Sequence, residues 1–441
     1  MITNHGVHEW NIIPGLPDTG GQNVFVNAFS DALAKFGFRI TIINRGGYRH
    51  PVSGKFQSGL HYKNEHQRIL YLDDGYNEFV RKEDMLAQIP ALVQYLGNFL
   101  DQEGTPVDLI ISHYWDGALI GVKLNHTLPE HVPHIWVPHS LGTLKKRNVK
   151  HDQWEKLRIA ERIEVEKSLI PELDGIAATS STIRNALTKD YGYTTPNLFL
   201  PPCVNSTRFY PHKIMENDPV WEYLSQRSNF SPIELRKMKI ITEISRTDTT
   251  KRKDILIKAF ERVNNKHPQS LLILSIDEKI QPLSTELLQL INSTSASSQI
   301  IPVGSIWDIL PSLYAISSIY CTPSIMEGFG MSAQEAAATG VPVVSSDLVP
   351  FVKEYLLGEN HETLYSPETE TPIQVGEGAI IVPADDIPGF TFALEYLLNN
   401  KLLRENMGMK AHQITIPYFT WNIQVKNFLE KLGYQANPIV N

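Results

Sequence analysis

The fold is decided by residues 326–340, which read Met-Glu-Gly-Phe-Gly-Met-Ser-Ala-Gln-Glu-Ala-Ala-Ala-Thr-Gly. An apolar run over 318–322 precedes them and indicates a buried parallel strand, and a second apolar strand follows over 341–345. Between the strands, a glycine-rich turn passes directly into an alanine-rich helix that ends at Gly340. The turn and the helix N-terminus aim free backbone N–H groups at one point, so we predict an anion site there, most often one for phosphate.

Two carboxylates, Glu327 and Glu335, flank this turn. Carboxylates repel phosphate, so in contact with a ligand they would accept hydrogen bonds from hydroxyls. A ligand that carries both a diphosphate and hydroxyls is a nucleotide sugar. The local alternative is that Ser332 and Glu335 form a capping box at the start of the helix, while Glu327 is a solvated surface carboxylate.

Length and composition indicate an ordinary globular enzyme, because 441 residues suffice for two or three domains and 42% of them are hydrophobic. The net charge of −8 and the lack of a long basic run argue against nucleic acid or an anionic membrane as a partner. No apolar segment reaches the roughly 18–20 residues that span a bilayer, and there is no secretion signal, so we expect a cytoplasmic protein. Cys203 and Cys321 predict neither a disulfide nor a zinc site.

The beginning of the chain predicts a βαβ unit. A short strand ends near Asn4, a helix begins near Gly20–Gly21, and the next strand covers 38–43. The unit lacks a G-x-G-x-x-G motif, so a dinucleotide is not indicated. Gly20 and Gly21 let the backbone approach a ligand closely at a helix N-terminus, although a plain tight turn is the simpler interpretation of the pair.

Two histidines follow predicted strands in the first half of the chain. His113 follows the strand over 107–112, and His139 follows the strand over 134–138. Ligands of open α/β sheets bind beyond the carboxyl ends of the strands, so both histidines lie where chemistry is expected. A lone histidine is more often structural or on the surface, and this alternative weighs most for His113.

Two cations follow the predicted strand over 237–244 in the second half. We expect Arg246 and Lys251 to face an interdomain cleft beside the anion site. Together with backbone donors, they could neutralise a diphosphate leaving group without a metal. The alternative is a lysine-rich surface loop.

These motifs resemble those of the retaining glycosyltransferases of the two-Rossmann-domain (GT-B) type, family 4 or glycosyltransferase group 1. Among these enzymes, they resemble the sucrose-phosphate synthase-like group. The resemblance covers nearly the whole chain, with the motifs in the same order. The E-x7-E spacing of Glu327 and Glu335 is one signature. Others are Asp-Thr-Gly-Gly-Gln over 18–22, His-Ser-Leu-Gly over 139–142 and R-x-D-x-x-K over 246–251.

The resemblance implies a role for individual residues. Glu327 would hold hydroxyls of the donor sugar, Glu335 the ribose, and a neutral His139 the transferred sugar. The residues implied in catalysis are His139, Glu327, Arg246 and Lys251. The implied donor-binding residues are Gly20, Gly21, Arg246, Lys251, Glu327, Gly328, Phe329, Gly330, Met331 and Glu335. The implied acceptor-binding residues are Gln22, Arg81, Lys82, His113, Lys145 and Arg162.

The implied fold is α/β, with two Rossmann-like domains built on doubly wound parallel sheets. We expect an acceptor-binding domain over 1–205 and a nucleotide-sugar-binding domain over 236–415. A linker with a short helix would cover 206–235, where the composition shifts to Asn, Pro, Ser and mixed charges. The C-terminal helix, within 416–441, would pack back on the first domain.

The implied function is the transfer of a hexose, with retention, from a nucleotide sugar of the UDP-glucose or GDP-mannose type to an anionic, phosphorylated acceptor. Trp115-Asp116, and 347–350 in place of a common Gly-Gly-Pro, depart from the pattern, so a mannosylglucosyl-3-phosphoglycerate synthase-type transferase is an alternative. A nucleotide-sugar epimerase, a phosphorylase and a non-catalytic sugar-nucleotide sensor are alternatives of other classes. We expect no metal site and no required cofactor, with Mg²⁺ at most stimulatory. The donor, the acceptor and the oligomeric state are left open.

Overall fold

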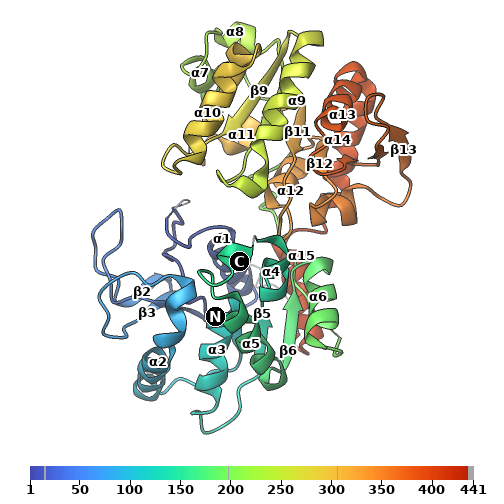
Figure 1. The fold of residues 1–441 in the computed structure, drawn as a ribbon. Coiled ribbons are helices and arrows are strands. Elements are labelled where there is room, and N and C mark those ends of the chain that lie inside the picture. Colours follow the sequence, from blue (N-terminus) through green and yellow to red (C-terminus); the bar gives the residue numbers. More distant parts are fainter. Residues whose placement is uncertain (14–15, 150, 197, 305, 436–441) are drawn as a thin grey trace. The chain divides into compact units, whose positions relative to one another are not determined.

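The computed structural model describes residues 1–13, 16–149, 151–196, 198–304 and 306–435 (Figure 1). The chain forms two compact units. Unit 1 comprises Met1–Pro202 and Trp421–Asn441, and unit 2 comprises Cys203–Thr420. Each unit has its own sheet and its own apolar core, as the α/β prediction requires.

Unit 1 is built on strands joined through the N-terminal residues. Its strands are β1 (Ile40–Arg45), β2 (Gly59–Asn64), β3 (Gln67–Leu72), β4 (Ile110–His113), β5 (His134–Val137), β6 (Gly175–Ala178) and β7 (Leu198–Phe199). Strands β4 to β7 are parallel neighbours, β1 pairs with β3 in parallel, and β2 is antiparallel to β3. Ile2 bridges Ile43 and Ser112. The predicted first strand is therefore reduced to one residue, Ile2, that bridges β1 and β4.

The helices of unit 1 pack on this sheet. They are α1 (Gly21–Lys35), α2 (Ile89–Glu103), α3 (Tyr114–Asn125), α4 (Gly142–Asn148), α5 (Ile159–Leu169), α6 (Ser181–Tyr191) and α15 (Trp421–Lys431), with the short 3₁₀ helices η1 (Lys82–Ala87), η2 (His151–Gln153) and η3 (Ile170–Glu172). The C-terminal α15 packs on α1, where Phe29 stacks on Trp421 and meets Phe428 edge to face. The two ends of the chain thus share one core.

Unit 2 carries a larger sheet in the order β10-β9-β8-β11-β12-β15-β14-β13. Its strands are β8 (Lys239–Glu243), β9 (Ser270–Ser275), β10 (Ile300–Val303), β11 (Ile319–Thr322), β12 (Val343–Ser346), β13 (Glu362–Tyr365), β14 (Pro372–Val375) and β15 (Ala379–Val382). The strands from β10 to β15 in this order are parallel, and the β14–β13 hairpin adds two antiparallel strands at one edge. From the central strands β8 and β11, the chain continues toward opposite edges of the sheet, which gives the doubly wound topology.

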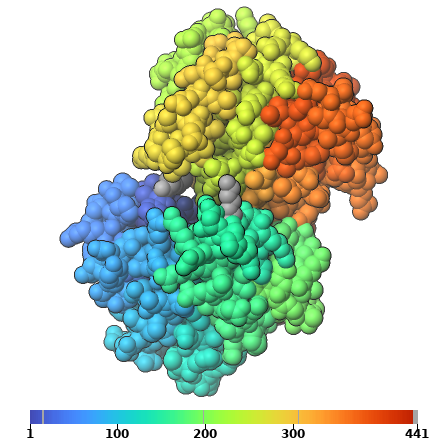
Figure 2. Space-filling view, in the orientation of Figure 1, coloured from blue at the N-terminus to red at the C-terminus, as the bar shows by residue number. Residues whose placement is uncertain are grey.

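The helices of unit 2 lie on both faces of the sheet, and the space-filling view shows residues near 280–295, in gold, at its surface (Figure 2). They are α7 (Pro219–Ser225), α8 (Pro232–Leu235), α9 (Lys253–Lys266), α10 (Leu283–Ser293), α11 (Leu310–Ala315), α12 (Met331–Ala338), α13 (Ile387–Asn399) and α14 (Lys401–Thr415), with the 3₁₀ helices η4 (Thr249–Lys251) and η5 (Ser297–Gln299) and the π-helix η6 (Val352–Leu356).

Helix α9 shows why periodic segments are predictable. Every residue that the pattern turns inward is at most 4% exposed: Ile255, Leu256, Ala259, Phe260 and Val263. These positions recur at helical spacing and form one apolar stripe against β9 and α13.

The segment 206–235 differs from the expected linker. It contains α7 and α8, and Val220, Leu224 and Leu235 are completely buried in the core of unit 2. The polar composition that suggested a linker belongs to the outer faces and turns, while a few apolar side chains anchor the segment. Among the described residues, no helix is both long and apolar enough to cross a membrane.

Candidate active site

The glycine turn before α12 has the geometry that an anion site requires. Gly330 has φ of 108°, and a Cβ on it would lie 2.6 Å from Cγ1 of Val349. Only glycine fits this left-handed, crowded position. Gly330 is also the N-cap of α12 and provides no side-chain cap, so the backbone N–H groups of the first turn are not occupied by the residue that precedes them.

Lys251 and Glu327 meet beside this turn, although 76 residues separate them in sequence. Their Nζ and Oε1 atoms are 2.5 Å apart, and Lys251 is 6% exposed. Two further hydrogen bonds join the segments, because the Thr250 carbonyl accepts from the backbone N–H of Ile325 at 2.8 Å and from the Ser324 hydroxyl at 3.3 Å. The structure therefore places the predicted cation against the predicted sugar-binding carboxylate.

Arg246 lies on the same loop as Lys251 but is exposed. It follows β8, and Asp248, two residues further on, caps η4 by accepting a hydrogen bond from the Thr250 N–H. Within the described ranges, no ion pair of the Arg246 guanidinium is found, so this cation is available to a ligand on the surface of unit 2.

Glu335 does not take part in a capping box. Helix α12 begins at Met331, so Ser332 is already its second residue and Glu335 lies within the helix. The Glu335 carboxylate instead accepts a hydrogen bond from the Tyr314 hydroxyl at 3.3 Å. Burial raises the pKa of Glu335 to about 7, while the bond from Tyr314 opposes this shift. The carboxyl group therefore changes charge near neutral pH.

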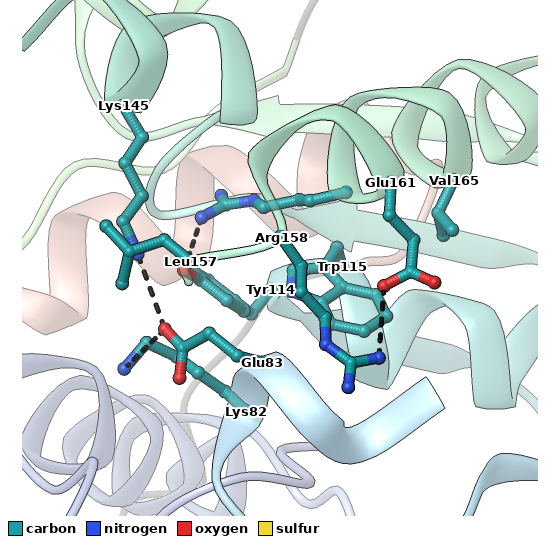
Figure 3. Close-up of a pocket in the computed structure, with 10 residues that line it drawn as sticks. Lys82, Glu83, Tyr114, Trp115, Lys145, Leu157, Arg158, Glu161 and Val165 are labelled. Atoms are coloured by element: carbon teal, nitrogen blue, oxygen red, sulfur yellow. Dashed lines mark hydrogen bonds and ion pairs between the residues drawn. The ribbon is translucent and has the colours of Figure 1, made fainter. Parts of the chain in front are cut away.

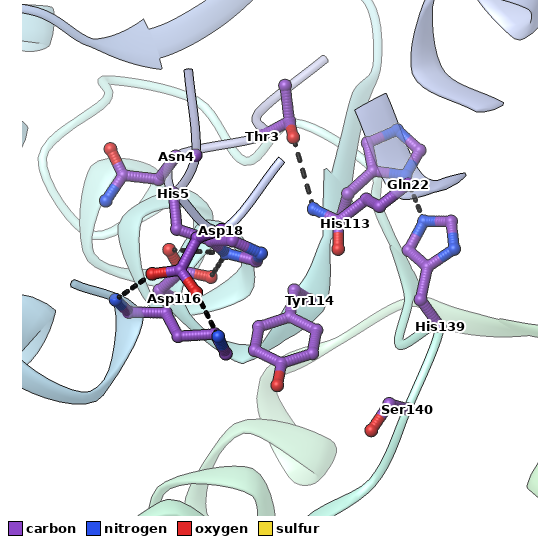
Figure 4. Close-up of polar contacts among 12 residues, drawn as sticks. Thr3, Asn4, His5, Asp18, Gln22, His113, Tyr114, Asp116, His139 and Ser140 are labelled. Atoms are coloured by element: carbon purple, nitrogen blue, oxygen red, sulfur yellow. Dashed lines mark hydrogen bonds and ion pairs between the residues drawn. The ribbon is translucent and has the colours of Figure 1, made fainter. Parts of the chain in front are cut away.

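The N-terminus of α1 provides the glycines of the second predicted loop. Gly20 is the N-cap of α1, and its N–H donates to Oδ1 of Asn23 at 3.0 Å. A Cβ on Gly20 would meet no heavy atom within 4 Å, so the turn is open on this side. The side-chain amide of Gln22 donates to the Thr3 hydroxyl at 3.2 Å (Figure 4).

His113 and His139 form one pair at the carboxyl ends of β4 and β5. Nδ1 of His113 is 2.9 Å from Nε2 of His139, and the two rings lie side by side in Figure 4. His113 is completely buried, whereas His139 is partly exposed and has a left-handed backbone with φ of 55°. Burial lowers the pKa of His139 to about 3, so its imidazole is neutral at any working pH.

A pocket in unit 1 brings together three of the predicted acceptor cations (Figure 3). Its empty volume is about 300 Å³, partly open to solvent. It is lined by Lys82, Glu83, Tyr114, Trp115, Lys145, Leu157, Arg158, Glu161, Arg162 and Val165. Cations outnumber carboxylates in this lining, as a site for an anion requires. Gln22, Arg81 and His113 are not among the described residues that line it.

The cations of this pocket differ in how completely nearby carboxylates balance their positive charge. Lys82 forms an ion pair with Asp18 and lies 3.5 Å from Glu83. Burial opposes the charge of Lys82, but the two carboxylates hold its pKa above the usual value. Lys145 has a single carboxylate contact, 3.4 Å to Glu83, and burial together with the Arg162 guanidinium lowers its pKa. Lys145 would therefore gain most from an anionic ligand.

Arg162 is largely committed to the protein itself. Its Nε donates to Glu166 at 2.7 Å, its Nη2 donates to the Ser140 carbonyl at 2.7 Å, and its Nη1 donates to the Tyr114 hydroxyl. It is 5% exposed. We therefore assign Arg162 mainly to bracing the turn that carries His139, while its role in acceptor binding stays a prediction.

Sequence reasoning missed several groups around these residues. His5 lies 3.0 Å from Asp116 (Figure 4), and Asp18 pairs with Lys82. Tyr114 has φ of 65°, which is rare for an aromatic residue and often marks a functional site. Only the i, i+4 spacing of Arg162 and Glu166 could have been read from the sequence. Over the described part of the chain, no group of three or more His, Cys, Asp or Glu side chains is arranged to hold a metal ion.

Two family models match this chain. Residues 19–208 match the model described as glycosyltransferase family 4, and residues 226–414 match the model described as glycosyl transferases group 1. The first match falls on unit 1 apart from its last six residues, and the second falls within unit 2.

Individual proteins are similar over most of their length. Mannosylfructose-phosphate synthase of Agrobacterium fabrum is 27% identical over 78% of this chain and 75% of its own. D-inositol 3-phosphate glycosyltransferase of Corynebacterium jeikeium is 26% identical over 76% and 77%. The solved structure of sucrose-phosphate synthase from Thermosynechococcus elongatus superposes with a TM-score of 0.76 at 21% identity, covering 98% of both chains. This likeness shows that the chain has the GT-B fold.

Proposed function

Because the chain belongs to the glycosyltransferases of group 1 and family 4, we propose that it transfers a hexose, with retention, from a nucleotide sugar to a phosphorylated acceptor. The donor is of the UDP-glucose or GDP-mannose type, and the acceptor is a sugar phosphate or a phosphoglycerate derivative. The observation that carries the proposal is the contact between Lys251 and Glu327 beside the open N-terminus of α12.

The donor's charged and hydroxylated parts suit different groups at this turn. Backbone N–H groups of α12, with Lys251 and Arg246, would take the diphosphate. Because Lys251 is bound to Glu327 in the free protein, an incoming diphosphate competes for the lysine and frees the carboxylate for sugar hydroxyls. Glu335, with a pKa near 7, would accept hydrogen bonds from the ribose once it is ionised.

The proposed step is a front-face substitution. The bond from the anomeric carbon to the diphosphate oxygen breaks, and the acceptor oxygen bonds to that carbon on the same face. The acceptor's hydroxyl proton passes to the departing phosphate oxygen, so no separate protein base is needed. Lys251 and Arg246 stabilise the negative charge that grows on the leaving group.

The pocket of unit 1 supports the proposed acceptor class. Lys82 and Lys145 present ammonium groups there. The positive charge of Lys145 is only partly balanced by a carboxylate, which favours a ligand with a phosphate. The two curated relatives described above carry a phosphorylated compound in their names, which supports the same class. For His139, contact with the transferred sugar stays a prediction.

The test is a screen for binding, then for product. Thermal shift with UDP-, GDP- and ADP-sugars would identify the donor, and incubation of that donor with hexose phosphates, inositol phosphate and phosphoglycerate derivatives would identify the acceptor. NMR of the product should show the anomeric configuration of the donor retained. Sugar isomerisation without an acceptor would indicate an epimerase, sugar phosphate released from a glycan would indicate a phosphorylase, and binding without any turnover would indicate a sensor. Each of these results contradicts the proposal.

A further inference from the structure

The histidine pair of unit 1 contains more information than the position of His139 alone. His113 Nδ1 and His139 Nε2 are in hydrogen-bond contact at 2.9 Å, so one ring donates and the other accepts. Burial lowers the pKa of both rings well below the usual value, so both are neutral. Two neutral arrangements satisfy this bond, and they leave opposite groups on the far nitrogen of His139.

The surroundings of His113 discriminate between the two arrangements. Its Nε2 is buried and has no hydrogen-bond partner among the described residues. The rings of Phe25 and Phe29, which pack near His113, carry no oxygen or nitrogen that could accept a bond. If His113 accepted at Nδ1, its Nε2 would carry a buried N–H without an acceptor, which proteins rarely tolerate. A proton on Nδ1 avoids this.

The backbone of His139, the other member of the pair, is also fixed by its contacts. His139 has a left-handed φ of 55°, and the next carbonyl, that of Ser140, accepts a hydrogen bond from the buried Arg162 at 2.7 Å. The His139 ring packs edge to face on Phe25, with centroids 4.8 Å apart. With its backbone and one ring face fixed, His139 is pre-organised to direct its remaining nitrogen.

We propose that His113 is a positioning residue that donates its Nδ1–H to His139 Nε2 and so holds His139 as the Nδ1–H tautomer. The nitrogen that His139 keeps for a ligand is then a hydrogen-bond donor. This inference rests on the proposed function only where it assigns that donor to a hydroxyl oxygen of the transferred sugar. It also gives fully buried His113 a role different from the predicted direct contact with the acceptor.

The tautomers can be read directly in the protein without any substrate. In ¹⁵N-histidine-labelled full-length chain, long-range ¹H–¹⁵N correlation spectra distinguish Nδ1–H from Nε2–H rings. The two rings would be assigned by the loss of their signals in His113→Phe and His139→Asn. We expect both histidines as Nδ1–H. An Nε2–H form of His139 would overturn the proposal, whatever the enzyme's substrate is.

Two variants of His113 test the consequence for turnover. Asn places an amide N–H close to the position of Nδ1, whereas Gln places its amide close to that of Nε2 and serves as the matched control. With the donor and acceptor found in the screen, His113→Asn should keep kcat within about threefold, whereas His113→Gln and His113→Phe should lose at least about tenfold, with acceptor KM little changed.

Thermal unfolding of each variant would show that the fold is kept. Equal losses of kcat in the Asn, Gln and Phe variants would mean that packing alone matters, and the positioning role would be rejected. If no donor and acceptor pair is turned over at all, the proposed function fails, while the tautomer of His139 is still decided by the spectra.

Discussion

The contact between Lys251 and Glu327 sets the charge balance of the donor site before any donor arrives. A pair with so little exposure to solvent is strong when intact, and removing one member leaves the other charge unpaired. Removal of Lys251 should therefore slow the chemical step and also lower stability, because Glu327 is left without its cation.

We expect Lys251→Ala to lower kcat by about 10²- to 10³-fold, since one preorganised group that stabilises leaving-group charge is lost. The measurement is initial-rate kinetics with the donor and acceptor found in the screen. Lys258→Ala, on the exposed face of α9, is the matched control and should behave as wild type. Unchanged turnover of Lys251→Ala with any donor would remove this residue from the mechanism.

Glu335 predicts a pH dependence of donor binding. Its pKa of about 7 in the free protein lies above the usual carboxyl value, so the group is mostly protonated below pH 7. Since ribose hydroxyls need the carboxylate as acceptor, affinity should rise as pH increases, by about tenfold between pH 6 and pH 8. Calorimetric titration with UDP and with GDP measures this.

The same titration of Glu335→Gln should give weaker binding without the pH step. Glu286→Gln, on the exposed face of α10, should retain the step. A step that persists in Glu335→Gln would mean that another group titrates.

At the scale of elements, the strand–turn–helix of β11 and α12 depends on one backbone conformation. The left-handed Gly330 directs α12 away from β11 and leaves no room for a side chain beside Val349. The loop that carries Arg246 and Lys251 is tied to the segment before this turn by hydrogen bonds from the Ile325 N–H and the Ser324 hydroxyl to the Thr250 carbonyl. A change in the conformation of one segment should therefore shift the other.

Gly330→Ala should destabilise unit 2 by about 1–3 kcal/mol, because a left-handed alanine is strained and its Cβ overlaps Val349. It should also weaken binding of UDP or GDP. Thermal unfolding and calorimetry measure the two effects. Gly304→Ala, which has open space around its Cβ and no positive φ, is the control. A Gly330→Ala protein with wild-type stability would mean that the turn can adopt another conformation.

At the scale of the whole molecule, the two units carry different chemistry. Unit 2 holds the glycine turn, Lys251 and Glu335, whereas unit 1 holds the cationic pocket and the histidine pair. Each has its own core, so a substitution in one unit should leave binding by the other intact.

This division predicts that Lys145→Ala raises the acceptor KM by about tenfold, because one charge-assisted contact is lost. The affinity for UDP or GDP should stay unchanged. Steady-state kinetics with varied acceptor and calorimetry with the nucleotide separate the two quantities. Lys146→Ala, whose residue is exposed on α4 and does not line the pocket, is the control. A loss of nucleotide affinity in Lys145→Ala would contradict the division.

Local pattern was enough to predict the strands β4, β5, β8 and β11, the inward face of α9 and the position of the α12 turn, because helix and strand periodicity and the need for glycine are encoded within a few residues. The contact of Lys251 with Glu327 also agrees with the prediction that both lie beside the turn. Tertiary structure decided the rest. Arg162 donates to Glu166, Tyr114 and Ser140. His113 is buried against His139, and Glu335 accepts a hydrogen bond from Tyr314. The polar 206–235 segment belongs to the core of unit 2. Partners that lie dozens of residues away in sequence are chosen by packing and by the cost of leaving buried polar groups unpaired, and no local pattern contains that information.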